Sequence, residues 1–62
     1  GYDKKAAEYY QLVGEIYEFD LKNLPNAVEH YEKAVYYYNL SGLINLKNKC
    51  ESNIIRLSGL IN

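Results

Sequence analysis

The chain has 62 residues, of which 48% are hydrophobic and 24% charged, with a formal net charge of −1. Its 7 basic and 8 acidic side chains are too evenly balanced for a nucleic-acid-binding protein, and no apolar run approaches the ~20 residues of a membrane-spanning helix. The single cysteine, Cys50, and the single histidine, His30, exclude an internal disulfide and a zinc-finger pattern. So short a chain without these stabilising features buries little core, and we therefore expect either that neighbouring protein covers it or that it is a piece of a longer protein.

A first helix is predicted from about residue 3 to residue 21. We expect the carboxylates Glu8, Glu15 and Glu18 to lie on a narrow polar face, with Glu18 paired to Lys22 four residues later. The apolar surface is about twice as wide as the ~100° stripe of an ordinary surface helix, which indicates neighbours on two sides, as in stacked helical arrays. Its residues form two adjoining rows at helical spacing, Ala6, Tyr10, Val13, Tyr17 and Leu21, and Tyr9, Leu12, Ile16 and Phe19.

A second helix is predicted from about residue 24 to residue 39. Asn23 is suited to the N-cap, and Pro25 is acceptable in the first turn, where its missing N–H has no intrahelical partner. Glu29 and Lys33 are placed for an exposed ion pair. The inner face of this helix is expected to consist of Ala27, Tyr31, Ala34 and Tyr38.

A third helix is predicted from about residue 43 to residue 61, after a break at "NLSGL". Gly42 is suited to a left-handed conformation in this break, and Ser41 to a cap. Cys50 lies within the apolar stripe and is expected to be a small buried hydrophobe. The stripe consists of Leu43, Leu46, Cys50, Ile54, Leu57 and Ile61. No segment alternates with period two, so residues 1–62 are predicted to be all-α: an antiparallel helix hairpin plus a third helix, as one slice of an α-solenoid domain.

Eight of the nine aromatic residues are tyrosines, and three of them are consecutive at positions 36 to 38. Successive residues of a helix point about 100° apart, which argues against a single aromatic cage built from these three. We expect Tyr36 and Tyr37 to meet a neighbouring helix or solvent. The tyrosines expected to pack between helices are Tyr10, Tyr17, Tyr31 and Tyr38.

No group of residues in the sequence has the pattern of a catalytic or metal site. His30 has no second metal ligand three or four residues away, and the carboxylates of the first helix have no histidine companion. We therefore expect no enzymatic activity, no metal and no cofactor.

The first two helices resemble a divergent tetratricopeptide repeat, a pair of antiparallel helices in which small residues and rings are matched in size. The residues that carry this resemblance are Tyr10, Val13, Gly14 and Tyr17 in the first helix and Ala27, Tyr31 and Ala34 in the second. The turn is one residue longer than in the standard repeat, and the usual terminal proline is missing near Asn39.

The whole segment resembles the middle of the soluble N-ethylmaleimide-sensitive factor attachment proteins, the SNAP family, of the alpha type. The resemblance covers nearly the whole chain without an evident gap and includes the longer turn. It is carried by Ala6-Ala7, Glu15-Ile16-Tyr17-Glu18, Leu21, Ala27, His30-Tyr31-Glu32, Tyr37-Tyr38 and Asn48-Lys49-Cys50.

This resemblance implies a cytoplasmic adaptor in intracellular vesicle traffic that associates peripherally with endomembranes. Proteins of this family bind the four-helix SNARE bundle left after membrane fusion and recruit a hexameric AAA+ ATPase, which pulls the bundle apart. The ATPase and the membrane are contacted through regions outside these 62 residues.

Of the family's basic SNARE-binding positions, only Lys49 is matched here by a basic residue. Glu8 and Asn53 stand where the family has lysines, which puts the detail of the electrostatic contact in doubt. An alternative from the residues alone is a generic tetratricopeptide-like scaffold that binds a peptide of a partner protein. In isolation the fragment is expected to self-associate through its wide apolar faces.

Overall fold

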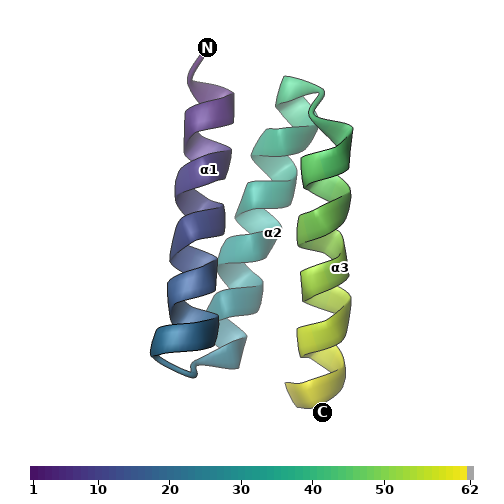
Figure 1. Cartoon of the computed structure of the whole chain (residues 1–62). Helices are drawn as coiled ribbons and strands as arrows, with labels where there is room; N and C mark the ends of the chain where they lie inside the picture. Colours follow the sequence, from purple (N-terminus) through teal and green to yellow (C-terminus); the bar gives the residue numbers. More distant parts are fainter. Residues whose placement is uncertain (62) are drawn as a thin grey trace.

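The computed structural model describes residues 1–61 and contains three long helices that lie side by side (Figure 1). Helix α1 spans Tyr2–Glu15 and continues into a π-helical turn, η1, at Ile16–Asp20. Helix α2 spans Leu24–Ser41 and α3 spans Ile44–Ile61. Short turns make consecutive helices antiparallel, so the predicted all-α fold, a hairpin plus a third helix, is confirmed. Residue 62 lies outside the described part of the chain.

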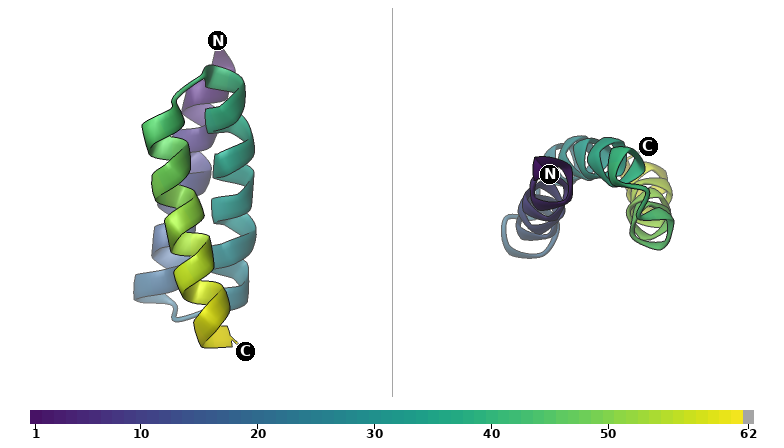
Figure 2. Two further views of the ribbon diagram at one scale, coloured as in Figure 1. Left: turned by 90° about the vertical axis from the view of Figure 1, so that its right-hand side faces the viewer. Right: turned by 90° about the horizontal axis from the view of Figure 1, so that it is seen from above.

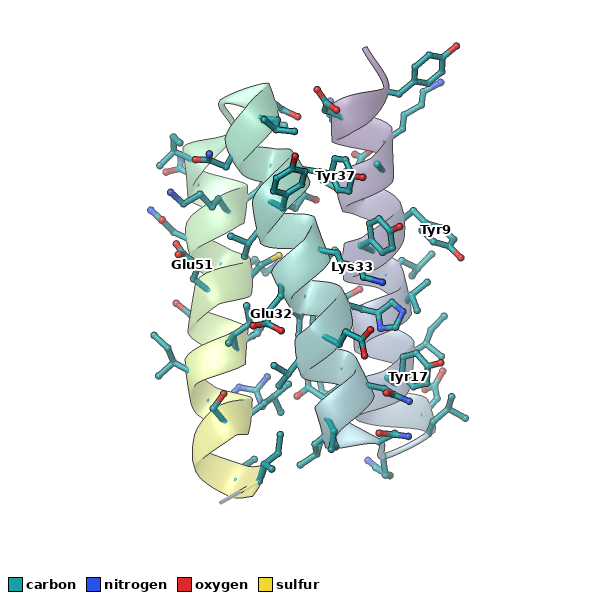
Figure 3. All side chains as sticks on the ribbon, turned by 180° about the vertical axis from the view of Figure 1, so that it is seen from behind. Tyr9, Tyr17, Glu32, Lys33, Tyr37 and Glu51 are labelled. Carbon is teal, nitrogen blue, oxygen red and sulfur yellow. The ribbon has the colours of Figure 1, made fainter. Side chains whose placement is uncertain are left out.

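The three helices form an arch with α2 at its centre. Viewed from above, they follow an arc, and α2 packs against both α1 and α3 (Figure 2). The concave side faces the viewer in Figure 1, and the convex side faces the viewer in Figure 3. This curvature is that of a slice from an α-solenoid, in which each repeat contacts only its neighbouring repeats. None of the helices within residues 1–61 is long and apolar enough to cross a membrane.

Small residues form the contact between α1 and α2. The predicted inner face of α2 is buried, with Ala27, Tyr31, Ala34 and Tyr38 all nearly inaccessible. On α1 the buried residues are Ala7 and Gly14, whereas the bulky row of Tyr9, Leu12, Ile16 and Phe19 is exposed. Two helices approach closely where their side chains are small, and bulky side chains are then displaced to the flanks. The second predicted row therefore lies outside this contact, whereas Tyr10 and Tyr17 of the first row pack against the core as predicted.

The turns use the residues that the sequence suggested, with one exception. The Asn23 side chain accepts a hydrogen bond from the Asn26 backbone N–H at 3.2 Å, which confirms the N-cap. Gly42 adopts the left-handed conformation, with φ of 74°. Ser41 is not an N-cap of the third helix, because it is the last residue of α2 and its hydroxyl donates to the Tyr37 carbonyl at 2.8 Å.

Large apolar surfaces remain uncovered on both outer helices. Tyr9 of α1 and Phe19 of η1 are 61% and 59% exposed, and Ile55 of α3 is 74% exposed. The stripe that does pack, around Cys50 and Leu57, faces α2. In a helical array each repeat buries apolar surface of this kind against the next repeat, so it is exposed where a neighbouring repeat is absent.

Replacing Gly14 by alanine tests the close approach of α1 and α2. A Cβ at this position would lie 2.9 Å from the Tyr31 ring, inside van der Waals contact, so the helices would have to separate. We expect Gly14→Ala to reduce the free energy of unfolding by about 1–3 kcal/mol in denaturant titrations. The matched control is Gly59→Ala in α3, where a Cβ meets nothing within 4 Å and should stabilise the helix by up to about 1 kcal/mol. Equal stabilisation by both substitutions would contradict this account.

Candidate functional site

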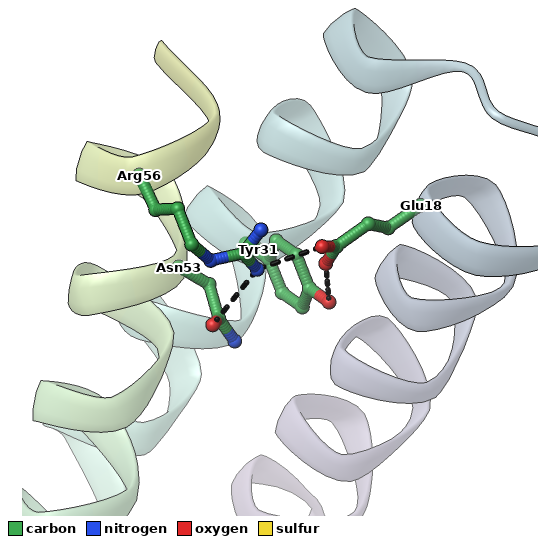
Figure 4. Close-up of polar contacts among 4 residues, drawn as sticks. All are labelled: Glu18, Tyr31, Asn53 and Arg56. Carbon is green, nitrogen blue, oxygen red and sulfur yellow. Dashed lines mark hydrogen bonds and ion pairs between the residues drawn. The ribbon is translucent and has the colours of Figure 1, made fainter. Parts of the chain in front are cut away.

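The concave side of the arch contains one carboxylate that links all three helical segments. Glu18 is 6% exposed and uses both of its oxygens (Figure 4). The Tyr31 hydroxyl of α2 donates to Oε1 at 2.9 Å, and the Arg56 guanidinium of α3 pairs with Oε2 at 2.7 Å. Arg56 also donates to the Asn53 side chain at 3.3 Å. A buried charge is tolerated only when it is paired and hydrogen-bonded, and Glu18 meets both conditions.

Glu18 therefore does not lie on a polar outer face, and its predicted pair with Lys22 is wrong. The reason is its register in the helix. Glu18 follows Ala7, Gln11 and Gly14 at intervals of four, three and four residues, which is the row that faces α2. The small residues in this row were the signal that could have identified it from the sequence, but the bulky apolar rows were more conspicuous.

The π-helical turn η1 carries Glu18 at the end of the first helix. Its wider turn is closed by a bond from the Leu21 N–H to the Ile16 carbonyl at 3.0 Å, five residues apart. The periodicity of the sequence did not predict this turn. Lys22 follows with a positive φ of 54°, which directs the chain into α2. Single π-turns of this kind often occur at functional positions in helices.

A second tyrosine of α2 makes a parallel contact with α1. The Tyr38 hydroxyl donates to the Gln11 side chain at 2.6 Å, two turns from the bond between Tyr31 and Glu18. Burial raises the pKa of Tyr31 well above its usual range, and the hydrogen bond to Glu18 raises it further. The pKa of Tyr38 is also raised, first by burial and then by the thiolate form of Cys50 and the charges of Glu8 and Glu15. Both phenols are therefore fixed as neutral donors.

Lys49, the predicted contact residue, is exposed on α3. It precedes Arg56 by seven residues, two helical turns, so both lie on the concave side of the helix. Within residues 1–61 no carboxylate forms an ion pair with Lys49, whereas Arg56 is bound to Glu18. Lys47 lies on another side, with its ammonium 3.5 Å from the Asn39 side chain of α2.

The two positions at which the resemblance implied lysines, Glu8 and Asn53, have different surroundings. Glu8 is exposed on α1, seven residues before the half-buried Glu15. Asn53 is half-buried and accepts the hydrogen bond from Arg56. The structure thus brings Asn53 to the Glu18 cluster and leaves Glu8 and Lys49 at the opposite edges of the arch. Sequence analysis missed Arg56, because its partner is 38 residues away in the chain and no local pattern connects the two.

The two remaining side chains that could take part in chemistry, His30 and Cys50, are held in packing contacts. The His30 ring lies 2.8 Å from the Asn26 carbonyl through Nδ1, and its centroid is 5.1 Å from that of Tyr17. Cys50 is buried as expected, and burial, followed by the nearby charge of Glu15, raises the pKa of its thiol to about 11. A thiol with so high a pKa is a poor nucleophile at neutral pH. No group of three or more potential metal ligands occurs in the part of the chain that the structure describes.

Comparison with known proteins identifies one family. The family model described as "Soluble NSF attachment protein, SNAP" matches residues 1–61, which is nearly the entire chain. No solved structure matches the chain closely enough to support a comparison.

The raised pKa of Tyr31 predicts how stability depends on pH. The unfolded chain releases the Tyr31 proton near pH 10, whereas the folded protein keeps it, so stability is lost as pH rises above about 10. We expect the stability difference between wild type and Tyr31→Phe to be constant from pH 7 to 9. It should shrink by up to about 1.4 kcal/mol per pH unit above pH 10.

Denaturant titrations across this pH range provide the measurement, with Tyr36→Phe as the control because Tyr36 is exposed. For this control, the free energy of unfolding should change with pH as it does in the wild type. Parallel curves for wild type and Tyr31→Phe above pH 10 would contradict the account.

Proposed function

Because the chain belongs to the soluble NSF attachment protein (SNAP) family, we propose that it is part of an adaptor that binds assembled SNARE complexes in intracellular vesicle traffic. The observation that carries this proposal is the family match over residues 1–61, and the curved three-helix arch supports it. The adaptor recruits the hexameric AAA+ ATPase N-ethylmaleimide-sensitive factor through regions outside these residues. It works in the cytoplasm and peripherally on endomembranes.

Within this slice, we propose Lys49 as the contact to the acidic surface of the SNARE bundle. Two observations support this role. Lys49 is exposed and in register with Arg56 on the concave side of α3, and no carboxylate of residues 1–61 forms an ion pair with it. Arg56 lies on the same side of α3, but its charge is already balanced by Glu18. Lys49 is therefore the α3 cation on this side that remains for a partner.

The acidic side chains of α1 restrict where an acidic partner can lie. Glu8 is exposed and Glu15 half-buried, and their charges raise the pKa of Tyr38. An acidic stripe placed over α1 would be repelled, because like charges at short range disfavour association. We therefore propose that the acidic surface of the SNARE bundle lies over α3, near Lys49.

The alternative is a tetratricopeptide-like scaffold that binds a peptide of a partner protein. The arch supports this alternative function as well, because extended concave surfaces are the binding surfaces of other helical-repeat proteins. The two functions differ in their ligand, which is an assembled four-helix bundle in one case and a single peptide in the other.

Reversing the charge of Lys49 tests the proposed contact. We expect Lys49→Glu in the intact protein to weaken binding to an assembled SNARE complex by roughly five- to tenfold at low salt. The effect should shrink at high salt, because exposed charges are screened. Lys47→Glu is the matched control, since it makes the same charge change two residues away and on another side of α3. Binding can be measured by surface plasmon resonance.

Equal loss with both substitutions would refute the specific contact at Lys49. Unchanged binding for Lys49→Glu would move the contact elsewhere while keeping the adaptor function. No binding of the wild-type protein would favour the peptide-binding scaffold.

The exposed apolar faces predict self-association of the isolated fragment. Tyr9 of α1, Phe19 of η1 and Ile55 of α3 are more than half exposed, and a second copy can cover them. Sedimentation velocity at micromolar concentrations should detect dimers or larger species. Tyr9→Glu, which places a charge on the α1 face, should shift the fragment toward monomer. A well-folded wild-type monomer at these concentrations would be incompatible with this prediction.

A further inference from the structure

The convex side carries an open hollow of about 380 Å³ between α1 and α2, opposite the Glu18 cluster. Its lining is unusual in composition, because it consists only of tyrosines and charged side chains. It is formed by Tyr10, Glu29, Glu32, Lys33, Tyr36 and Tyr37. None of these residues takes part in the proposed SNARE contact.

The three rings of the hollow form one continuous aromatic surface. The ring of Tyr37 stacks on that of Tyr10, with centroids 5.7 Å apart and planes 10° apart. Tyr36 meets Tyr37 edge to face at 5.0 Å. Two of the three consecutive tyrosines therefore line one surface, while Tyr38 is buried elsewhere, so the three do not form a single cage. Side chains as long as tyrosine can lean together although their Cα–Cβ bonds point about 100° apart.

Lys33 shows which ligand chemistry this surface accepts. Its ammonium lies 5.4 Å from the centroid of the Tyr10 ring and 3.8 Å from the Glu29 carboxylate. A cation is thus held between a ring and a carboxylate, the two groups that attract cations most strongly at a protein surface. Figure 3 shows Lys33 and Tyr37 on the side of α2 toward α1, with Glu32 further round the same helix.

A second ring and carboxylate in the hollow have no such cation. Glu32 and Tyr36 are four residues apart, so they are neighbours on the surface of α2. Tyr36 is 60% exposed, and no basic residue pairs with Glu32 within the described chain. This ring and carboxylate therefore lack the cation that Lys33 supplies to Tyr10 and Glu29.

We propose that this hollow binds an arginine side chain of a partner protein, with the guanidinium against the Tyr36 and Tyr37 rings and paired to Glu32. Arginine fits better than lysine because its planar guanidinium stacks on rings and forms two parallel hydrogen bonds to a carboxylate. The hollow is on the convex side, so the partner can bind while the concave side is occupied. This inference goes beyond the proposed SNARE contact and does not depend on it.

The test is a binding titration of the intact protein with a fluorescein-labelled peptide, Gly-Arg-Gly-Arg-Gly, followed by fluorescence anisotropy. A peptide with citrulline in place of arginine has the same shape without the charge. We expect the arginine peptide to bind and the citrulline peptide to bind at least threefold more weakly. Equal affinity for the two peptides would overturn the proposal.

Two substitutions locate the site. Glu32→Gln and Tyr36→Ala should each weaken binding of the arginine peptide by roughly three- to tenfold. The matched control is Glu51→Gln, which removes the same charge from an exposed position on α3, outside the hollow (Figure 3). Circular dichroism establishes that each variant is folded. If Glu32→Gln and Glu51→Gln weaken binding equally, or if Tyr36→Ala has no effect, the attraction is a general effect of net charge and the proposal fails.

Discussion

The arch depends on the hydrogen bond and the ion pair that stabilise one buried carboxylate, Glu18. Glu18 lies where three helical segments meet, and an unpaired charge at that place would cost more than the small core could supply. The Tyr31 hydroxyl and the Arg56 guanidinium each occupy one of its oxygens, so the polar link crosses the concave side from the end of the first helix to α3. Because α1 and α3 otherwise pack mainly against α2, this link restrains the distance between them.

Size matching between α1 and α2 makes that link possible. Gly14 lies against the face of the Tyr31 ring, and this close approach brings the Tyr31 hydroxyl within reach of Glu18. The same arrangement recurs at Tyr38 and Gln11. The tyrosines thus fill the space beside small residues and also supply the hydrogen bonds that the polar side chains of α1 need. These contacts favour one curvature of the arch, with Lys49 on its concave side.

Sequence analysis predicted the parts of this fold that depend on local patterns. The inner face of α2, the N-cap at Asn23 and the left-handed Gly42 follow from spacing and from the conformational preferences of single residues. The position of Glu18 was mispredicted, because bulky apolar residues were weighted above the small ones that mark a close helix contact. Arg56 could not be found, since its partner comes from another helix and pairing over such separation leaves no periodic signal.

The candidate contact residue was identified by resemblance, and the physical pattern alone would not have selected it. Lys49 and Lys47 are two lysines in one polar stretch, and helical spacing already places them about 200° apart around the predicted helix. Which of the two lies on the concave side of α3 became clear only when Arg56 was seen to face Glu18. The hollow on the convex side was missed for a related reason. Tyr10 and Tyr37 come from different helices, and their stacking depends on the packing of α1 on α2.

The most direct test of the central claim is a double-mutant cycle on Glu18 and Arg56. The free energy of unfolding is measured for wild type, Glu18→Gln, Arg56→Gln and the double variant. The account predicts a coupling energy of about 1–2 kcal/mol, less than for a fully buried pair because the Arg56 side chain is 48% exposed. Additive effects, with a coupling below about 0.5 kcal/mol, would show that this ion pair does not hold the arch together.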